Sequence, residues 1–124
     1  MATIGEVMTR SILSVDPSTT VAEAATVMGE RAAGSALVMR DDRLLGIFTE
    51  RDIVRALGQH FDAATHAVAD WMTPDPVTVG ADTTVEEALD TMLGRGFRHL
   101  PVVEDDRVVG VVSLRDLSRA RSEG

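Results

Sequence analysis

The chain has 124 residues, of which 44% are hydrophobic and 26% charged, as expected for a globular protein of one or two small units. Its net charge of −8, with one tryptophan and three phenylalanines, argues against a nucleic-acid-binding protein, which needs a basic face or stacking side chains. The absence of cysteine and lysine excludes disulfides, a thiol nucleophile and a Schiff base. No apolar run approaches the roughly 20 residues of a membrane span, and no secretory signal is visible. We therefore expect a cytoplasmic protein with no membrane contact.

An internal repeat organises the sequence. Residues 8–56 align with residues 72–120 at a constant offset of 64, and 19 of the 49 pairs are identical. A single copy is near the size at which an isolated core becomes marginal, so the two copies should share one pseudo-symmetric body. We assign residues 1–60 to the first repeat, residues 61–67 to a connector and residues 68–124 to the second repeat.

Each repeat begins with a short strand followed by a helix. Residues 12–15 and 77–79 have the character of short strands. Thr20 and Thr84 each precede a helix, and a glutamate three residues later completes the pattern of a capping box. Apolar residues then recur at the spacing of one helical face, which predicts that this face packs against a core.

The second half of each repeat contains two apolar strands, a tight turn and another helix. Continuous apolar runs at residues 36–39 and 100–103 predict buried strands. An Asp-Asp turn joins each run to a further apolar strand, residues 44–48 and 108–112, and a short helix follows. The predicted fold class is mixed α/β (α+β), with two β-α-β-β-α repeats packed about a pseudo-two-fold axis.

One motif at the start of the last helix could bind a ligand, and both repeats have it. Thr49 and Ser113 stand at strand-to-helix junctions, with Asp52 and Asp116 three residues later. In one interpretation these residues are only helix caps. In the other, the helix N-terminus and hydroxyl bind a phosphate, and the carboxylate accepts hydrogen bonds from a ribose. A strand glycine three residues before each hydroxyl would let a flat base approach the backbone.

The other polar residues are weak candidates for chemistry. His60, at the end of the first repeat, and Asp62 and His66 in the connector are spaced too widely for a convincing metal site, so we expect no metal. Trp71 is expected in a core or an interface. No nucleophile, base and orienting group come together in the sequence, so we expect no catalytic residues and no enzyme activity.

The repeat resembles the cystathionine β-synthase (CBS) domain family over residues 4–120. The matching segments are Met8-Thr9, residues 20–24 and residues 46–52 (GIFTERD) in the first repeat, and residues 72–74, 84–88, 98–103 and 110–116 (GVVSLRD) in the second. The resemblance implies a stand-alone tandem pair, a Bateman-type module with a regulatory or sensor function. It also implies adenosine-containing ligands in clefts between the repeats: AMP, ADP or ATP, with NAD and S-adenosylmethionine as further candidates. No cofactor is required.

The resemblance also implies a role for each matching residue. The carboxylates bind the ribose, the hydroxyls face the phosphate, and the apolar residue two before each hydroxyl touches the base. The start of the opposite copy's first strand forms the other wall. The residues so assigned are Asp52 and Asp116 (ribose), Thr49 and Ser113 (phosphate), Ile47 and Val111 (base), Leu13 and Val77 (other wall), and Ser35 (a further polar contact).

The two sites are not expected to be equal. Arg98, with His99 beside it, stands where the family often has a basic residue near the phosphates. The first repeat has Gly34 and Ser35 at the aligned positions and lacks the proline that follows. A nucleotide brings negative charge to a protein of net charge −8, so local cations should matter. We therefore predict tighter binding at the second site.

The family also implies assembly. Two such pairs commonly associate into a flat disc, and dimers are the commonest closed symmetry, so we expect a homodimer. A protein partner that responds to the ligand is expected but not identified by the sequence. The alternative function is a structural dimerisation module that binds no ligand, in which the hydroxyl and carboxylate motifs are only caps.

Overall fold

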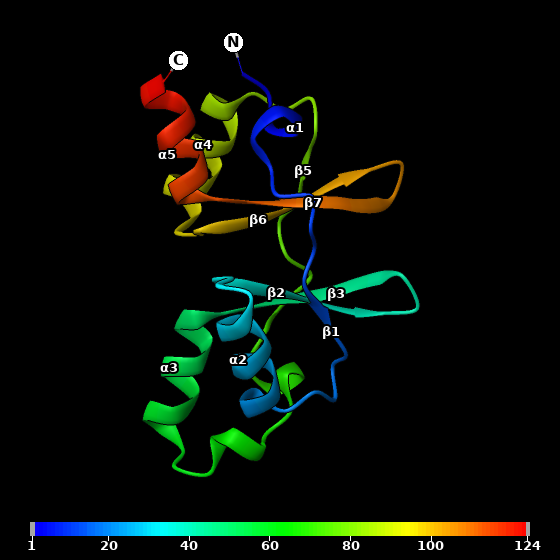
Figure 1. The fold of residues 1–124 in the computed structure, drawn as a ribbon, viewed down its shortest axis with the longest axis vertical. Coiled ribbons are helices and arrows are strands. Elements are labelled where there is room, and N and C mark those ends of the chain that lie inside the picture. The colour runs from blue at the N-terminus through cyan, green and yellow to red at the C-terminus, as the bar shows by residue number, and fades with distance from the viewer. Residues whose placement is uncertain (1, 124) are drawn as a thin grey trace. The chain divides into compact units, whose positions relative to one another are not determined.

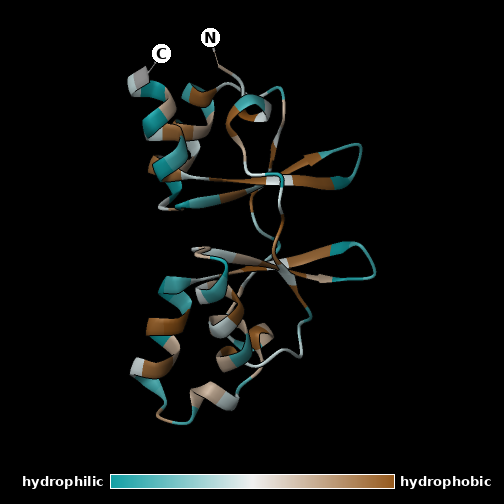
Figure 2. Ribbon diagram, in the orientation of Figure 1, coloured by the Kyte–Doolittle hydropathy of each residue, from teal (hydrophilic) through white to brown (hydrophobic). Residues whose placement is uncertain are grey.

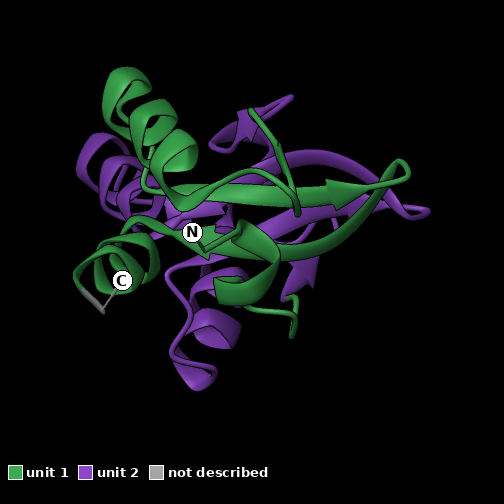
Figure 3. Ribbon diagram, turned by 90° about the horizontal axis from the view of Figure 1, so that it is seen from above, with its two compact units in different colours: residues 1–12, 77–124 green, residues 13–76 purple. Residues whose placement is uncertain are grey.

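In the computed structural model, which describes residues 2–123, the chain folds into two compact units (Figures 1 and 3). We call residues 13–76 the middle unit. The split unit contains residues 1–12 together with residues 77–124. The chain therefore starts in the split unit, forms the whole middle unit and then returns to complete the split unit.

The middle unit contains a four-stranded sheet in the order β1-β2-β3-β4, with two α-helices and two short 3-10 helices. Strand β1 is parallel to β2, whereas the β2–β3 and β3–β4 pairs are antiparallel. The elements are β1 (Ser14–Val15), α2 (Val21–Glu30), β2 (Ser35–Arg40), β3 (Arg43–Thr49), α3 (Glu50–Gln59), η1 (Ala63–Thr65), η2 (Val68–Asp70) and β4 (Thr73–Pro74).

The split unit repeats this plan with a three-stranded sheet in the order β5-β6-β7. The N-terminal segment of this unit occupies the position that β4 occupies in the middle unit. Thr9 forms an antiparallel bridge with Val111, as Thr73 does with Ile47. The elements are α1 (Ile4–Val7), β5 (Val79–Gly80), α4 (Val85–Arg95), β6 (His99–Glu104), β7 (Arg107–Ser113) and α5 (Leu114–Glu123).

The predicted capping boxes are confirmed. At the start of α2, Thr20 Oγ1 accepts a hydrogen bond from the Glu23 N–H at 3.1 Å, and Glu23 Oε1 accepts one from the Thr20 N–H at 2.9 Å. The bond from the Thr20 N–H holds the pKa of Glu23 below its ordinary value. The box therefore contributes stability above the ordinary pKa of glutamate and loses it as the pH falls through the lowered value. Thr84 and Glu87 form the same box at α4.

Each unit has its own hydrophobic core, and the predicted helical faces contribute to it. Val21, Ala24 and Met28 of α2 pack with Phe48 of β3 in the middle unit. The corresponding face of α4 packs with β6, β7 and Ile4 of α1 in the split unit. Figure 2 shows largely hydrophobic strands in the split unit and hydrophilic turns at the ends of the hairpins. The mixed α+β class is confirmed, whereas the packing about a pseudo-two-fold axis stays a prediction.

The Asp-Asp turns lie at exposed hairpin ends, as expected. Asp41 and Asp42 have φ angles of 51° and 64°, and Asp105 and Asp106 have the same pair of values. Asp tolerates this left-handed region better than most residues because its short side chain can bond locally. The helix α1 and the strand β4 were not predicted from the sequence.

The strand glycines Gly46 and Gly110 make room for a neighbouring segment of the chain. A Cβ on Gly46 would overlap Met72 Sδ and lie 2.8 Å from the Thr73 carbonyl oxygen. A Cβ on Gly110 would lie 2.9 Å from the carbonyl oxygen of the corresponding threonine, Thr9. The edge segment fills the space beside each glycine, so the missing side chain serves this packing, and the approach of a base to the backbone stays a prediction.

A Gly46→Ala substitution tests this packing role. The added methyl group should push the Met72-Thr73 segment away from β3 and lower the free energy of unfolding by about 1–3 kcal/mol. Urea denaturation measures the change. In the same unit, Gly29 of α2 has no atom within 4 Å of an added Cβ. Gly29→Ala should therefore raise stability by about 0.5–1 kcal/mol, and equal effects of the two substitutions would contradict the assignment.

Candidate functional site

Both candidate sites lie where a long strand ends and the last helix of the unit begins. In the middle unit β3 ends at Thr49, which is the N-cap of α3, and Thr49 pairs with Ser35 of β2. In the split unit β7 ends at Ser113, which pairs with His99 of β6. The hydrogen-bonded register of each hairpin thus fixes where the hydroxyl stands.

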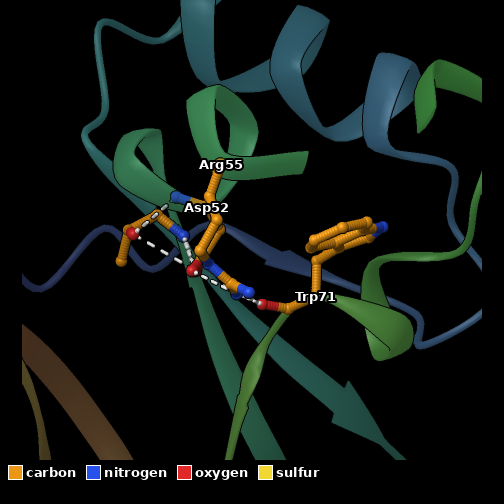
Figure 4. A network of polar contacts seen from close by, with 4 residues as sticks. Asp52, Arg55 and Trp71 are labelled. Carbon is orange, nitrogen blue, oxygen red and sulfur yellow. Dashed lines mark hydrogen bonds and ion pairs between the residues drawn. The ribbon is translucent and has the colours of Figure 1, made fainter. Parts of the chain in front are cut away.

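In the middle unit the Asp52 carboxylate faces back toward the end of β3. Its Oδ2 accepts hydrogen bonds from the Thr49 N–H at 2.9 Å and from Thr49 Oγ1 at 3.2 Å, while the Asp52 N–H donates to Thr49 Oγ1 at 3.4 Å (Figure 4). Asp52 is 7% exposed, and among the described residues no other charged residue is buried. Burying a carboxylate is costly unless hydrogen bonds or a cation compensate it, and Asp52 has both.

The cation beside Asp52 is Arg55, one turn further along α3. Its Nη2 donates to Asp52 Oδ1 at 3.2 Å and to the Trp71 carbonyl oxygen at 2.7 Å. The guanidinium lies 5.1 Å from the centroid of the Trp71 ring, within the range of a cation–π contact. Arg55 therefore links the candidate carboxylate to the segment that precedes β4.

Trp71 is itself held by a histidine of the connector. Its indole N–H donates to His66 Nδ1 at 3.2 Å, the two rings stack at 14°, and His66 Nε2 lies 3.5 Å from Asp62 Oδ1. Trp71 is 8% exposed and belongs to the core of the middle unit, as predicted. Across the described residues, no group of three or more His, Cys, Asp or Glu is arranged to hold a metal ion.

The carboxylate of the split unit has a simpler environment. Asp116 Oδ2 accepts a hydrogen bond from the Ser113 N–H at 3.3 Å, and Ser113 Oγ accepts one from the Asp116 N–H at 3.1 Å. Asp116 is half-buried, and within the described part of the chain it forms no ion pair with Arg119. Arg119 aligns with Arg55 and is exposed.

The structure brings most of the predicted residues of each site into one unit. Arg98 stands directly before β6, and its carbonyl oxygen accepts from the Leu114 N–H at 2.8 Å, which places Arg98 at the start of α5. Leu13 and Val77 each lie in the unit opposite to the carboxylate that they were expected to complement, so this role stays a prediction. The remaining assignments are Ser35, Ile47, Thr49 and Asp52 in the middle unit, and His99, Val111, Ser113 and Asp116 in the split unit.

Arg55 and His66 are parts of the site that were not predicted from the sequence. A signal for Arg55 was present, because it follows Asp52 by three residues on a helix and can pair with it. The same spacing occurs at Arg119, where no such pair forms, so spacing alone does not predict the contact. The sequence suggests only a metal-ligand role for His66, whereas in the structure His66 Nδ1 accepts a hydrogen bond from the Trp71 indole N–H.

Two units of this architecture, each with a hydroxyl–carboxylate pair at the N-terminus of its last helix, define a tandem α+β module. The family model of the CBS domain matches residues 4–59 and 68–123, so the chain belongs to the CBS domain family. No helix in the described part of the chain combines the length and apolar character needed to cross a membrane.

Similar proteins include both uncharacterised chains and solved structures. An uncharacterised 17.7 kDa protein of Acidianus ambivalens is 43% identical over 97% of this chain and 74% of its own length. The CBS-domain-containing protein ATU1752 of Agrobacterium tumefaciens is 31% identical, with a TM-score of 0.92 over 97% of this chain and 99% of that one. CBSX2 of Arabidopsis thaliana, solved in complex with AMP, is 29% identical, with a TM-score of 0.84 over 99% and 98% of the two chains.

A His66→Phe substitution tests the contact that holds Trp71. Phenylalanine keeps a ring beside the indole but removes the acceptor, which leaves the Trp71 N–H buried without a partner. The free energy of unfolding should fall by about 1–3 kcal/mol, measured by urea denaturation followed by circular dichroism. His60 contacts the same indole through its ring alone. His60→Phe should therefore change stability by less than about 0.5 kcal/mol, and equal losses in the two variants would count against the hydrogen bond.

Proposed function

We propose that this CBS domain pair is a non-catalytic regulatory module that binds an adenosine-containing ligand at the N-termini of α3 and α5. The proposal rests on one observation above all: both units place a hydroxyl and a carboxylate together at the junction of a strand and a helix. It is supported by the likeness to CBSX2, a protein solved in complex with AMP. AMP, ADP and ATP are the leading ligands, with NAD and S-adenosylmethionine as further candidates.

The local chemistry at each helix start suits such a ligand. The first N–H groups of a helix and its positive end attract a phosphate, and Ser113 adds a hydroxyl donor, whereas the Thr49 hydroxyl already donates to Asp52 Oδ2. Asp52 or Asp116 can accept hydrogen bonds from ribose hydroxyls. In the split unit the exposed Arg98 adds a cation at the start of α5, where its carbonyl oxygen accepts from the Leu114 N–H. The middle unit has Gly34 at the equivalent place, with its carbonyl oxygen accepting from the Glu50 N–H. We therefore propose that the site at Asp116 binds a nucleotide more tightly than the site at Asp52.

The alternative is a structural module in which these residues only cap helices. One observation supports this alternative: the reciprocal hydrogen bonds between Thr49 and Asp52 are those of a complete capping box. Caps of this kind stabilise a helix without any ligand. A ligand titration separates the two functions, because caps alone give no binding that depends on the carboxylate.

The test is calorimetric titration of AMP, ADP, ATP, NAD and S-adenosylmethionine into the wild-type chain and its variants. Asp116→Ala should weaken the tighter binding event by roughly tenfold or more, since a hydrogen bond to a charged group contributes about 1.5–3 kcal/mol. Arg98→Ala should have an effect of similar size on phosphorylated ligands. Asp52→Ala should affect only the weaker event.

The matched control is Asp90→Ala, which removes one exposed carboxylate from α4 and changes the net charge equally. It should leave both binding events unchanged within about twofold, because exposed charges so placed interact weakly. If Asp52→Ala and Asp116→Ala fold normally and bind all five compounds as the wild type does, the motifs are caps and the sensor function is wrong.

We also propose that the chain assembles as a homodimer and acts on a protein partner. The helix α3 exposes two large apolar side chains one turn apart on one face, Val54 at 72% and Leu57 at 47%, and Phe61, two residues beyond the end of the helix, is 98% exposed. Large exposed apolar groups of this kind are typical of an interaction surface.

Light scattering at micromolar concentration tests the assembly. We expect twice the chain mass of 13.3 kDa for the wild type and a shift toward the single-chain mass for Phe61→Asp, because a charge there opposes burial of the face. A wild-type mass equal to that of one chain would rule out the dimer.

A further inference from the structure

The two carboxylates differ in how much hydrogen-bonding capacity they have left. An ionised carboxylate offers about four acceptor positions on its two oxygens. At Asp52 three are occupied, two on Oδ2 by the N–H and hydroxyl of Thr49 and one on Oδ1 by Arg55. At Asp116 the Ser113 N–H occupies one, at 3.3 Å from Oδ2. Asp52 can therefore accept one further bond, whereas Asp116 can accept both hydroxyls of a ribose.

The donor that makes this difference is fixed in place. Both hydrogens of Arg55 Nη2 are used, one on Asp52 Oδ1 and the other on the Trp71 carbonyl oxygen at 2.7 Å. The guanidinium also lies over the indole ring of Trp71, which is itself buried and bonded to His66. A ribose that engages Asp52 through both hydroxyls must displace Arg55 from this arrangement.

The second repeat has the arginine but lacks the tryptophan. At the constant offset of 64, Arg119 aligns with Arg55 and Val7 aligns with Trp71. Val7 packs on the core of the split unit, as Trp71 does in the middle unit, yet it has no ring for a guanidinium to cover. Arg119 is exposed, and the described residues show no ion pair between it and Asp116. The indole is thus a feature that the held arginine contacts and that the exposed arginine lacks.

We propose that Arg55, held by Trp71, is a specificity-determining residue that occupies the Asp52 carboxylate and prevents the first site from selecting a ribose. This inference rests on the proposed function and adds a difference between its two sites. The site at Asp116 distinguishes ribose from 2′-deoxyribose, because losing one hydroxyl loses one of two bonds to the carboxylate. The site at Asp52 does not, because the remaining hydroxyl can fill its single free position.

The readout is the ratio of the Kd for 2′-deoxy-AMP to the Kd for AMP. Both compounds have the same phosphate, so the effect of removing a positive charge on phosphate binding cancels in the ratio. One hydrogen bond to a charged group corresponds to roughly tenfold or more in affinity. We expect a ratio of about ten at the Asp116 site and a ratio near one at the Asp52 site.

The experiment isolates one site at a time by calorimetry. Asp116→Ala leaves the Asp52 site, and adding Arg55→Met removes the donor while keeping an unbranched side chain over the indole. The ratio should rise from near one to about ten in the double variant, since Asp52 Oδ1 then has two free acceptor positions, one for each ribose hydroxyl. Arg55→Gln, which keeps an amide donor without the charge, is the second variant if the methionine variant folds poorly, and its ratio should fall between the two.

The matched control is Arg119→Met combined with Asp52→Ala, which should leave the ratio of the Asp116 site near ten. Circular dichroism confirms folding of each protein. If the wild type binds AMP through Asp116 but the ratio of the Asp52 site stays near one in both Arg55 variants, the inference about Arg55 is wrong and the proposed function stands. If no protein in the series binds AMP, the wild type included, both are wrong.

Discussion

The reciprocal hydrogen bonds between a hydroxyl residue and the acidic residue three positions later determine where the helices of this protein begin. All five α-helices among the described residues start with such a pair, and in three of them the acid is Glu6, Glu23 or Glu87 at the surface. In the described part of the chain, only α3 and α5 have an aspartate as the acid and a hydroxyl residue at the end of a long strand, and of these acids only Asp52 is buried. The motif is thus general in this chain, and the position of the strand end makes two of its copies candidate sites.

Most of the secondary structure followed from the repeat and from apolar periodicity, because those elements are stabilised by contacts that are local or lie within one hairpin. The elements that were missed are α1, β4 and the 3-10 helices η1 and η2. Of these, α1 and β4 are short and are ordered by contacts with distant strands. Nor could the sequence predict which unit takes residues 1–12. The segments Met8-Thr9 and Met72-Thr73 have the same sequence, and Gly46 of β3 and Gly110 of β7 leave the same space for a Met-Thr segment. The sequence therefore does not show which of the two segments pairs with which strand.

The candidate site was predicted in part for similar reasons. Thr49, Asp52, Ser113 and Asp116 were identified because hydroxyl and carboxylate lie within one helical turn. The contact of Arg55 with Trp71 spans 16 residues, and the identical arginine in the other repeat concealed its importance. The difference between the repeats lies in the residue that the arginine contacts, which is Trp71 for Arg55, whereas the position aligned with Trp71 is Val7.

The division of the split unit has a consequence for synthesis of the chain. The middle unit is a continuous stretch and is complete once residue 76 has left the ribosome. Ile4 emerges early but is buried in the core of the split unit, where its N–H donates to the Thr83 carbonyl oxygen at 2.8 Å, and α1 also packs near β7 and α5. At roughly 5–20 residues per second, the first segment must wait several seconds for these partners. The middle unit can therefore fold while the apolar face of α1 is still uncovered, and α1 gains its partners only after β7 and α5 have been made.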